Sequence, residues 1–135
     1  MIELAGGLTR VAAAVQERSG GAYVVTVTAD GRPHATYAAV RWEDGGLAAD
    51  VGAQTAHNAQ ARPLVTLLFP GRSADDYSLI VDGAATVDPA RRHLLVKPSR
   101  AVLHRPGAPS DPTSSCSADC VPLFAALAPA GPRAS

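Results

Sequence analysis

The sequence predicts a mainly β protein with minor α content, folded as a small six-stranded antiparallel barrel. Six short runs rich in β-branched and apolar residues follow one another, and only two stretches have helical features. Local turns join most neighbouring runs, which is typical of antiparallel sheets. A chain of 135 residues that is 47% hydrophobic has enough apolar surface for one core, so we expect one barrel domain.

The first half of the chain predicts a helix followed by a three-strand meander. The apolar positions Leu8, Val11, Ala12 and Val15 recur at helical spacing, which predicts a helix over residues 4–18. Turn sequences rich in Gly and Asp separate the next three segments, so every connection between them is local. The predicted strands cover residues 22–29, 34–42 and 47–51.

A short helix and three further strands are predicted after the meander. The stretch "VGAQTAHN", residues 51–58, leads into a helix over residues 56–62, for which Thr55 is the expected N-cap and Pro63 the stop. The strands that follow cover residues 64–69, 77–87 and 94–105, the last one bent at Pro98.

The composition changes after Arg105. Seven of the eleven prolines lie from Pro98 onward, and residues 107–120 have no hydrophobic period. We therefore divide the chain into a barrel domain, residues 1–106, and a partly ordered Pro-rich arm, residues 107–135. Within the arm, the apolar run "VPLFAALAP" is expected to dock onto the barrel, because its exposure would be costly.

The charge balance excludes several classes of partner. Twelve basic and twelve acidic residues give no net charge, so we expect neither nucleic acid nor a membrane surface as partner.

The N-terminal segment lacks the features of a secretory signal, and no apolar run reaches the roughly 20 residues needed to span a bilayer. A cytoplasmic protein with reduced cysteines is the expectation.

The order of these segments resembles the pyridoxamine 5'-phosphate oxidase-like, FMN-binding split β-barrel superfamily. The resemblance is carried by "TVTADGRPHATYAAVRWEDGGLAADVGAQTAHNAQARPLVTLLFPG", followed by "VDGAATV" and "RAVLHRP" in the expected order. The resemblance covers roughly residues 22–106. It depends on the order in which these segments follow one another, since no single motif is decisive. The resemblance implies a homodimeric split barrel with two flavin sites at the subunit interface.

The resemblance also implies where a flavin phosphate would bind. In the superfamily, basic residues of the second strand and of the entrance to the short helix hold this phosphate. The second-strand positions fall on Thr36 and Arg41, and the helix-entrance positions fall on Ala53, Gln54 and Thr55, so most of the positive charge is missing here. We take Thr36, Arg41, Gln54 and Thr55 as cofactor contacts, and add His57 for its place at the helix entrance.

The predicted function is that of a flavin-dependent or deazaflavin-dependent oxidoreductase that acts on a small organic substrate, with FMN as the first cofactor candidate. No catalytic acid, base or nucleophile is assigned. The alternative is a non-flavin binding protein on the same scaffold that holds haem, a metal or a small ligand. No metal site is predicted, and Cys116 and Cys120 are the only candidate thiolate ligands. A structural dimer with a partner-binding C-terminal arm is the third reading.

Overall fold

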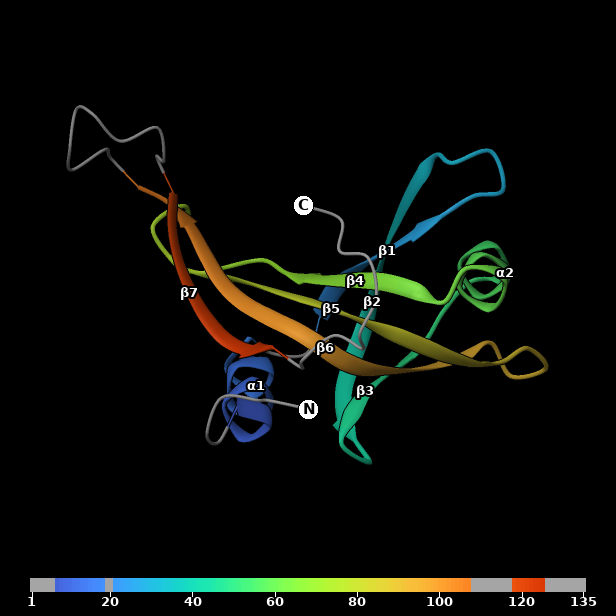
Figure 1. Ribbon diagram of the computed structural model, residues 1–135, viewed down its shortest axis with the longest axis horizontal. Coiled ribbons are helices and arrows are strands. Elements are labelled where there is room, and N and C mark those ends of the chain that lie inside the picture. The colour runs from blue at the N-terminus through green and yellow to red at the C-terminus, as the bar shows by residue number, and fades with distance from the viewer. Residues whose placement is uncertain (1–6, 19–20, 108–117, 126–135) are drawn as a thin grey trace.

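The computed structural model describes residues 7–18, 21–107 and 118–125, and Figure 1 traces the chain. Two helices and seven strands lie within these ranges. Their bounds are α1 Gly7–Glu17, β1 Gly21–Val27, β2 Pro33–Glu43, β3 Gly46–Asp50, α2 Ala53–Ala61, β4 Leu64–Phe69, β5 Ser78–Asp88, β6 His93–Pro106 and β7 Ala118–Ala125. None of the described helices is long and apolar enough to cross a membrane.

The first six strands form a closed antiparallel barrel, which confirms the predicted fold class. The strands follow the order β3-β2-β1-β4-β5-β6-β7, and an additional pairing of β3 with β6 closes the ring. All of these pairings are antiparallel. The predicted strands agree with the observed ones to within two residues, and strand 64–69 agrees at both ends. Residues 4–6 of the predicted N-terminal helix lie outside the described ranges.

Alternation along the strands separates a core face from an outer face. In β2, the buried side chains of Ala38 and Val40 alternate with the exposed Tyr37, Ala39 and Arg41. Whereas the first four residues of β3 are all buried, a similar alternation in β1, β4 and β5 contributes to one apolar core. Its largest fully buried side chains are Phe69, Leu47, Leu67, Leu79 and Leu94.

The seventh strand adds to the barrel along β6 and packs against α1. Leu123 and Phe124 of β7 are buried and belong to the same core as Val11 of α1. The helix approaches β7 so closely that a Cβ on Gly7 would lie 2.9 Å from Phe124 Cδ1. Part of the apolar run that was expected to dock therefore completes the core. In Figure 1, α1 and α2 lie at opposite ends of the barrel.

A polar cluster holds the first residues of β7 against the barrel. The Tyr77 hydroxyl donates to Asp119 Oδ2 at 2.6 Å, and Arg105 Nε donates to the same oxygen at 3.1 Å. The Arg105 guanidinium also lies over the Tyr77 ring, 4.4 Å from its centroid. The hydrogen bond from Tyr77, followed by Arg105, lowers the pKa of Asp119, while the same bond raises the pKa of Tyr77.

This cluster predicts an acid-sensitive contribution to stability. Because the pKa of Asp119 is lower in the folded state, the carboxylate stabilises the fold in full above its unfolded pKa of about 4, and this contribution is lost as the pH falls through the folded value. We expect Asp119→Asn to reduce the fall in Tm measured by circular dichroism between about pH 6 and pH 3. The exposed Asp88→Asn is the control, and an unchanged acid response of Asp119→Asn would contradict this role.

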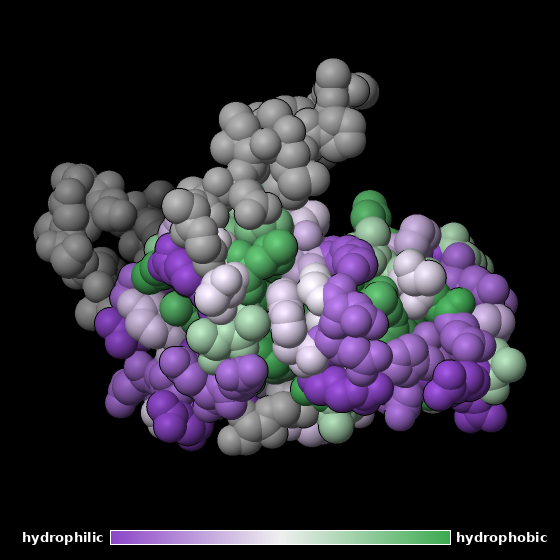
Figure 2. Space-filling view, turned by 90° about the horizontal axis from the view of Figure 1, so that it is seen from below, coloured by the Kyte–Doolittle hydropathy of each residue, from purple (hydrophilic) through white to green (hydrophobic). Residues whose placement is uncertain are grey.

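Large exposed hydrophobic side chains gather on the outer face of three adjacent strands. Tyr37 on β2, Tyr23 on β1 and Leu64 on β4 have exposed fractions of 61%, 43% and 76%. The two tyrosine rings stack edge to face, with centroids 5.1 Å apart. Figure 2 shows one face of the molecule, on which hydrophilic residues (purple) and hydrophobic residues (green) are both exposed. We call the outer surface of β2, β1 and β4 the apolar sheet face.

Candidate functional site

The entrance of α2 follows directly after β3, at the stretch 51–58 that the sequence singled out. Gly52 is the N-cap residue with an extended backbone (φ −73°, ψ 167°), and no side chain caps the helix. The prediction of Thr55 as N-cap is wrong, because the helix begins at Ala53 and Thr55 lies in its first turn. Among the described residues, no acceptor bonds the amides of Ala53, Gln54 and Thr55, and the first bond runs from Ala56 N to Gly52 O at 3.0 Å.

Thr55 is linked to the second strand instead. Its hydroxyl lies 3.0 Å from that of Thr36, so a hydrogen bond joins α2 to β2. Thr55 is 1% exposed, whereas Thr36 is half-buried. Two hydroxyls that share one bond use only one of their two hydrogens, so the pair keeps one donor for a ligand. The structure thus brings together Thr36 and Thr55, two of the residues that the resemblance singled out.

A buried amide fixes the position of α2 on the barrel. Asn58 is 0% exposed, and its Nδ2 donates to the buried Thr26 Oγ1 of β1 at 3.0 Å. Gln54 Nε2 donates to Asn58 Oδ1 at 2.8 Å. The side chain of Gln54, which was predicted to contact the cofactor, is therefore bonded within its own helix in this structure. Arg62 Nε adds a bond to Val27 O at 2.7 Å at the other end of the helix. These bonds hold the helix entrance beside β1 and β2.

Arg41 lies apart from the Thr36–Thr55 pair. It is five residues from Thr36 on the same strand, so the two side chains leave opposite faces of β2. Its Nε donates to Glu43 Oε2 at 2.8 Å, and the Arg41 side chain is 56% exposed. The described residues thus bring no cation to the two hydroxyls, as the sequence comparison with the superfamily positions anticipated.

At the end of β3, a histidine is hydrogen-bonded to a carboxylate. His93 Nδ1 donates to Asp50 Oδ1 at 2.9 Å across the β3–β6 pairing. This bond is the main cause that lowers the pKa of Asp50, and Arg41 and Arg91 lower it further through their charges. The carboxylate of Asp50 therefore lies within the electrostatic influence of Arg41 and Arg91 on this side of the helix entrance.

His57 lines a separate cavity on the opposite side of α2 from Thr55. The cavity has a volume of about 170 Å³ and is lined by Ala53, Ala56, His57, Gln60, Pro89 and Arg92. The four helical residues are spaced as one helix face, whereas Thr55 and Asn58 belong to the face toward the barrel. The structure therefore does not bring His57 to the Thr36–Thr55 pair.

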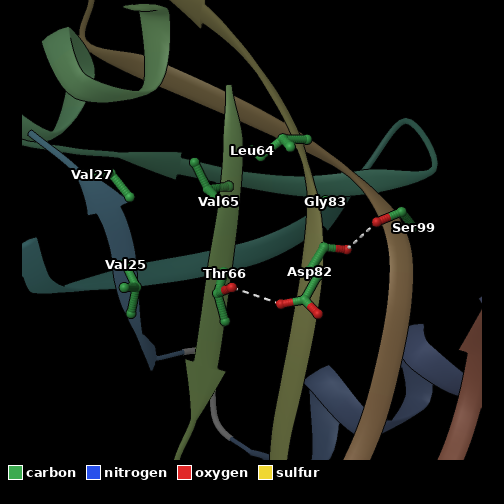
Figure 3. Close-up of a pocket in the computed structure, with 8 residues that line it drawn as sticks. All are labelled: Val25, Val27, Leu64, Val65, Thr66, Asp82, Gly83 and Ser99. Atoms are coloured by element: carbon green, nitrogen blue, oxygen red, sulfur yellow. Dashed lines mark hydrogen bonds between the residues drawn. The ribbon is translucent and has the colours of Figure 1, made fainter. Parts of the chain in front are cut away.

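A larger open cavity of about 280 Å³ lies beside the apolar sheet face. Its walls are Val25, Val27, Leu64, Val65, Thr66, Asp82, Gly83 and Ser99, which Figure 3 shows as sticks. At its polar end, Thr66 Oγ1 donates to Asp82 Oδ1 at 2.6 Å and Ser99 Oγ donates to Asp82 O at 3.2 Å. Arg100 Nη1 lies 3.3 Å from Asp82 Oδ2. The carboxylate is the one charged group of this lining.

No metal centre is found in the part of the chain that the structure describes, where no three His, Cys, Asp or Glu side chains gather. Cys120 is exposed on β7, and Cys116 lies outside the described residues. The predicted absence of a metal site and the candidate pair Cys116 and Cys120 both remain predictions.

Sequence reasoning did not single out Asn58, Thr26 or Arg92. A signal for Asn58 exists in the sequence, because it lies three residues after Thr55 and so shares its helix face. No local signal places Thr26 beside Asn58 or brings Arg92 to the same cavity as His57, since each pair lies more than 30 residues apart in the sequence.

Comparisons with known proteins give one clear sequence relationship. No protein-family model matches the chain. An uncharacterised protein of Mycobacterium bovis and one of Mycobacterium tuberculosis are each 42% identical to it over 78 residues. Each alignment covers 53% of this chain and 55% of the relative, so the match spans about half the length of these curated relatives.

Solved structures share the fold. A candidate pyridoxamine 5'-phosphate oxidase from Listeria innocua is 20% identical (TM-score 0.51), with 60% of this chain and 65% of that chain covered. An F420 reductase is 18% identical (TM-score 0.53; 65% and 93% covered). A heme-binding protein from Mycobacterium smegmatis is 14% identical (TM-score 0.54; 88% and 58% covered). At these identities the likeness establishes the fold, which is the predicted split barrel.

Proposed function

We propose that this chain is a homodimeric flavin or deazaflavin oxidoreductase. It has the split-barrel fold of the pyridoxamine 5'-phosphate oxidase-like proteins. The phosphate-bearing side chain of the cofactor binds at the entrance of α2, and the substrate is a small organic molecule. When bound, such a cofactor supplies hydride or electron transfer, and the protein supplies binding, orientation and a shaped pocket. Structural neighbours described as an F420 reductase and a heme-binding protein make a planar redox cofactor a reasonable class of ligand.

One observation carries this proposal: the hydrogen bond between Thr36 and Thr55 at an uncapped helix N-terminus. It joins a β2 position to an α2 position that the superfamily resemblance independently assigns to phosphate binding. The amides of Ala53, Gln54 and Thr55 have no acceptor among the described residues, and the partial positive charge of the helix end favours an anion. A Cβ built on Gly52 would meet no atom within 4 Å, so a ligand can approach this backbone.

The donors at this entrance fit an anionic group, and they are neutral. Backbone amides and a threonine hydroxyl replace the charged side chains that the superfamily places here. Hydrogen bonds between uncharged groups contribute about 1 kcal/mol each, less than charge-assisted ones. We therefore expect micromolar rather than nanomolar cofactor affinity, and a chain that is purified with only part of its sites filled.

The apolar sheet face supports the homodimer. Tyr23, Tyr37 and Leu64 expose large hydrophobic surfaces on three adjacent strands, and contiguous patches of this kind mark interaction sites in soluble proteins. A second copy that presents the same patch across a two-fold axis would cover both patches at once. The dimer and the cofactor proposal are separate and have separate tests.

Titration with FMN, with deazaflavin coenzyme F420 and with haem, followed by visible absorption and fluorescence, tests the cofactor proposal. We expect saturable binding of FMN or F420. Thr36→Val and Thr55→Val should each weaken this binding about fivefold to tenfold, because each removes one hydroxyl. Thr86→Val, which removes an exposed hydroxyl from β5, is the matched control and should leave the affinity unchanged.

Three outcomes would contradict the proposal. Binding of haem alone would support the alternative of a non-flavin binding protein. Flavin binding that neither threonine substitution weakens would place the cofactor elsewhere on the barrel. A chain that binds none of the three would leave only the structural dimer.

A further inference from the structure

We propose that the cavity between α2 and the β5–β6 turn binds the oxyanion group, carboxylate or phosphate, of a small organic molecule. For brevity we call this cavity, lined by Ala53, Ala56, His57, Gln60, Pro89 and Arg92, the turn cavity. It lies on the side of α2 that faces away from the Thr36–Thr55 pair. The proposal therefore goes beyond the cofactor site and does not depend on it.

Three polar side chains of the turn cavity are free to bind a ligand. Among the residues that the structure describes, no hydrogen bond or ion pair engages the side chains of His57, Gln60 or Arg92. All three carry N–H donors, and none of the lining residues is acidic. The planar guanidinium of Arg92 presents paired donors that match a carboxylate or phosphate. The donor set is thus suited to an oxyanion.

The β5–β6 turn directs only one of its three consecutive basic residues into the turn cavity. His93 is bonded to Asp50, and the charge of Arg91 also acts on Asp50. Arg92 lies between them in a left-handed backbone conformation (φ 52°) and lines the cavity instead. The positive charge of Arg92 is consequently not neutralised by the Asp50 carboxylate, which lies toward His93 and Arg91.

The two walls of the turn cavity are fixed relative to each other. Val51 N donates to Arg92 O at 2.9 Å, one residue before the N-cap of α2. Asp50 and His93 are directly paired strand residues next to this bond. The helix and the turn therefore hold a defined separation, and a site on such elements needs little ordering when it binds a ligand.

The remaining lining is apolar and small. Ala53, Ala56 and Pro89 complete the lining of this open cavity, whose volume of about 170 Å³ suits an anionic group that carries a short carbon skeleton. A small carboxylic acid or phosphate ester has this combination of one oxyanion and a short carbon skeleton. A large polyanion such as a nucleic acid does not.

Titration of the full chain with sodium phosphate and, separately, with sodium succinate at constant ionic strength tests this proposal. The readouts are the NMR signals of the His57 ring and the Arg92 Nε–H group. We expect saturable millimolar binding of at least one anion, with shifts centred on these two residues. Arg92→Gln should weaken it about tenfold or more, and His57→Ala by about threefold, because each loses a donor to the oxyanion.

Arg91→Gln is the matched control, because it removes the same charge from the same turn but not from the cavity. It should leave the affinity within about twofold. Arg92→Lys keeps the positive charge but loses the planar guanidinium with its paired donors, so this variant should bind the anion with intermediate affinity. Such binding would also show that the turn tolerates a substitution at this position. Saturation by phosphate or by succinate identifies the anion class. Absence of saturation with both anions, or equal weakening by Arg91→Gln and Arg92→Gln, would overturn the proposal.

Discussion

Asn58→Ala is expected to lower the free energy of unfolding by about 2 to 3 kcal/mol, a large effect for a change on a nine-residue helix. The side chain is fully buried and makes the bond that joins α2 to Thr26 of β1. Its removal leaves the buried Thr26 hydroxyl without this partner and opens a small cavity. Urea unfolding followed by circular dichroism measures the change.

The same substitution is expected to weaken the cofactor site. Asn58 does not belong to the Thr36–Thr55 pair, but it holds the helix whose first turn carries Thr55 and the free amides. A loosened helix should lower flavin or deazaflavin affinity by about tenfold. Gln54→Ala is the matched control for stability, because it removes an exposed partner of the same network and should cost less than about 1 kcal/mol. Equal destabilisation by both changes would contradict the anchoring role of Asn58.

Leu64→Asp is expected to convert the dimer to a monomer. Leu64 is 76% exposed in the single chain and lies on the apolar sheet face, so a charge at this position would be buried without a partner in the proposed interface. We expect the dissociation constant of the dimer to rise about a hundredfold or more, measured by sedimentation equilibrium.

The control for this experiment is Ala13→Asp, which adds the same charge on the exposed side of α1. It should leave the dimer intact. A wild-type chain that sediments as a monomer at all concentrations, or a dimer that Leu64→Asp leaves unchanged, would contradict the role of the apolar sheet face.

The strands could be predicted closely because each has a local cause. Residues 64–69 are a nearly continuous apolar run between Pro63 and Pro70, and the observed strand has the same ends. The hairpin of β1 and β2 is set by the short turn between two β-branched segments, in which Gly31 adopts φ 82°. Ring closure through β3 and β6 is different, because it pairs residues about 45 apart and no local pattern encodes it. The number of strands and the local turns predicted a barrel, but they do not identify the two strands that close it.

The candidate site could be predicted only in part, because side-chain direction and tertiary partners decide it. The pairing of Thr36 with Thr55 agrees with the positions that the resemblance indicated. Arg41 lies five residues after Thr36 on the same strand, so its side chain leaves the opposite face, which the spacing in the sequence already indicates. Thr55 suits an N-cap by propensity, but the hydrogen bond to Thr36 and the start of the helix at Ala53 give it another role. The helical spacing places His57 on the face of α2 that lines the turn cavity, away from Thr55.

Amide NMR of the labelled chain during titration with the cofactor tests most directly whether a flavin or deazaflavin phosphate binds at the uncapped entrance of α2. We expect the largest shifts on the amides of Ala53, Gln54 and Thr55, and we expect Thr36→Val to reduce them at equal cofactor concentration. Shifts that are centred elsewhere on the barrel, with these three amides unchanged at saturation, would contradict binding at this entrance.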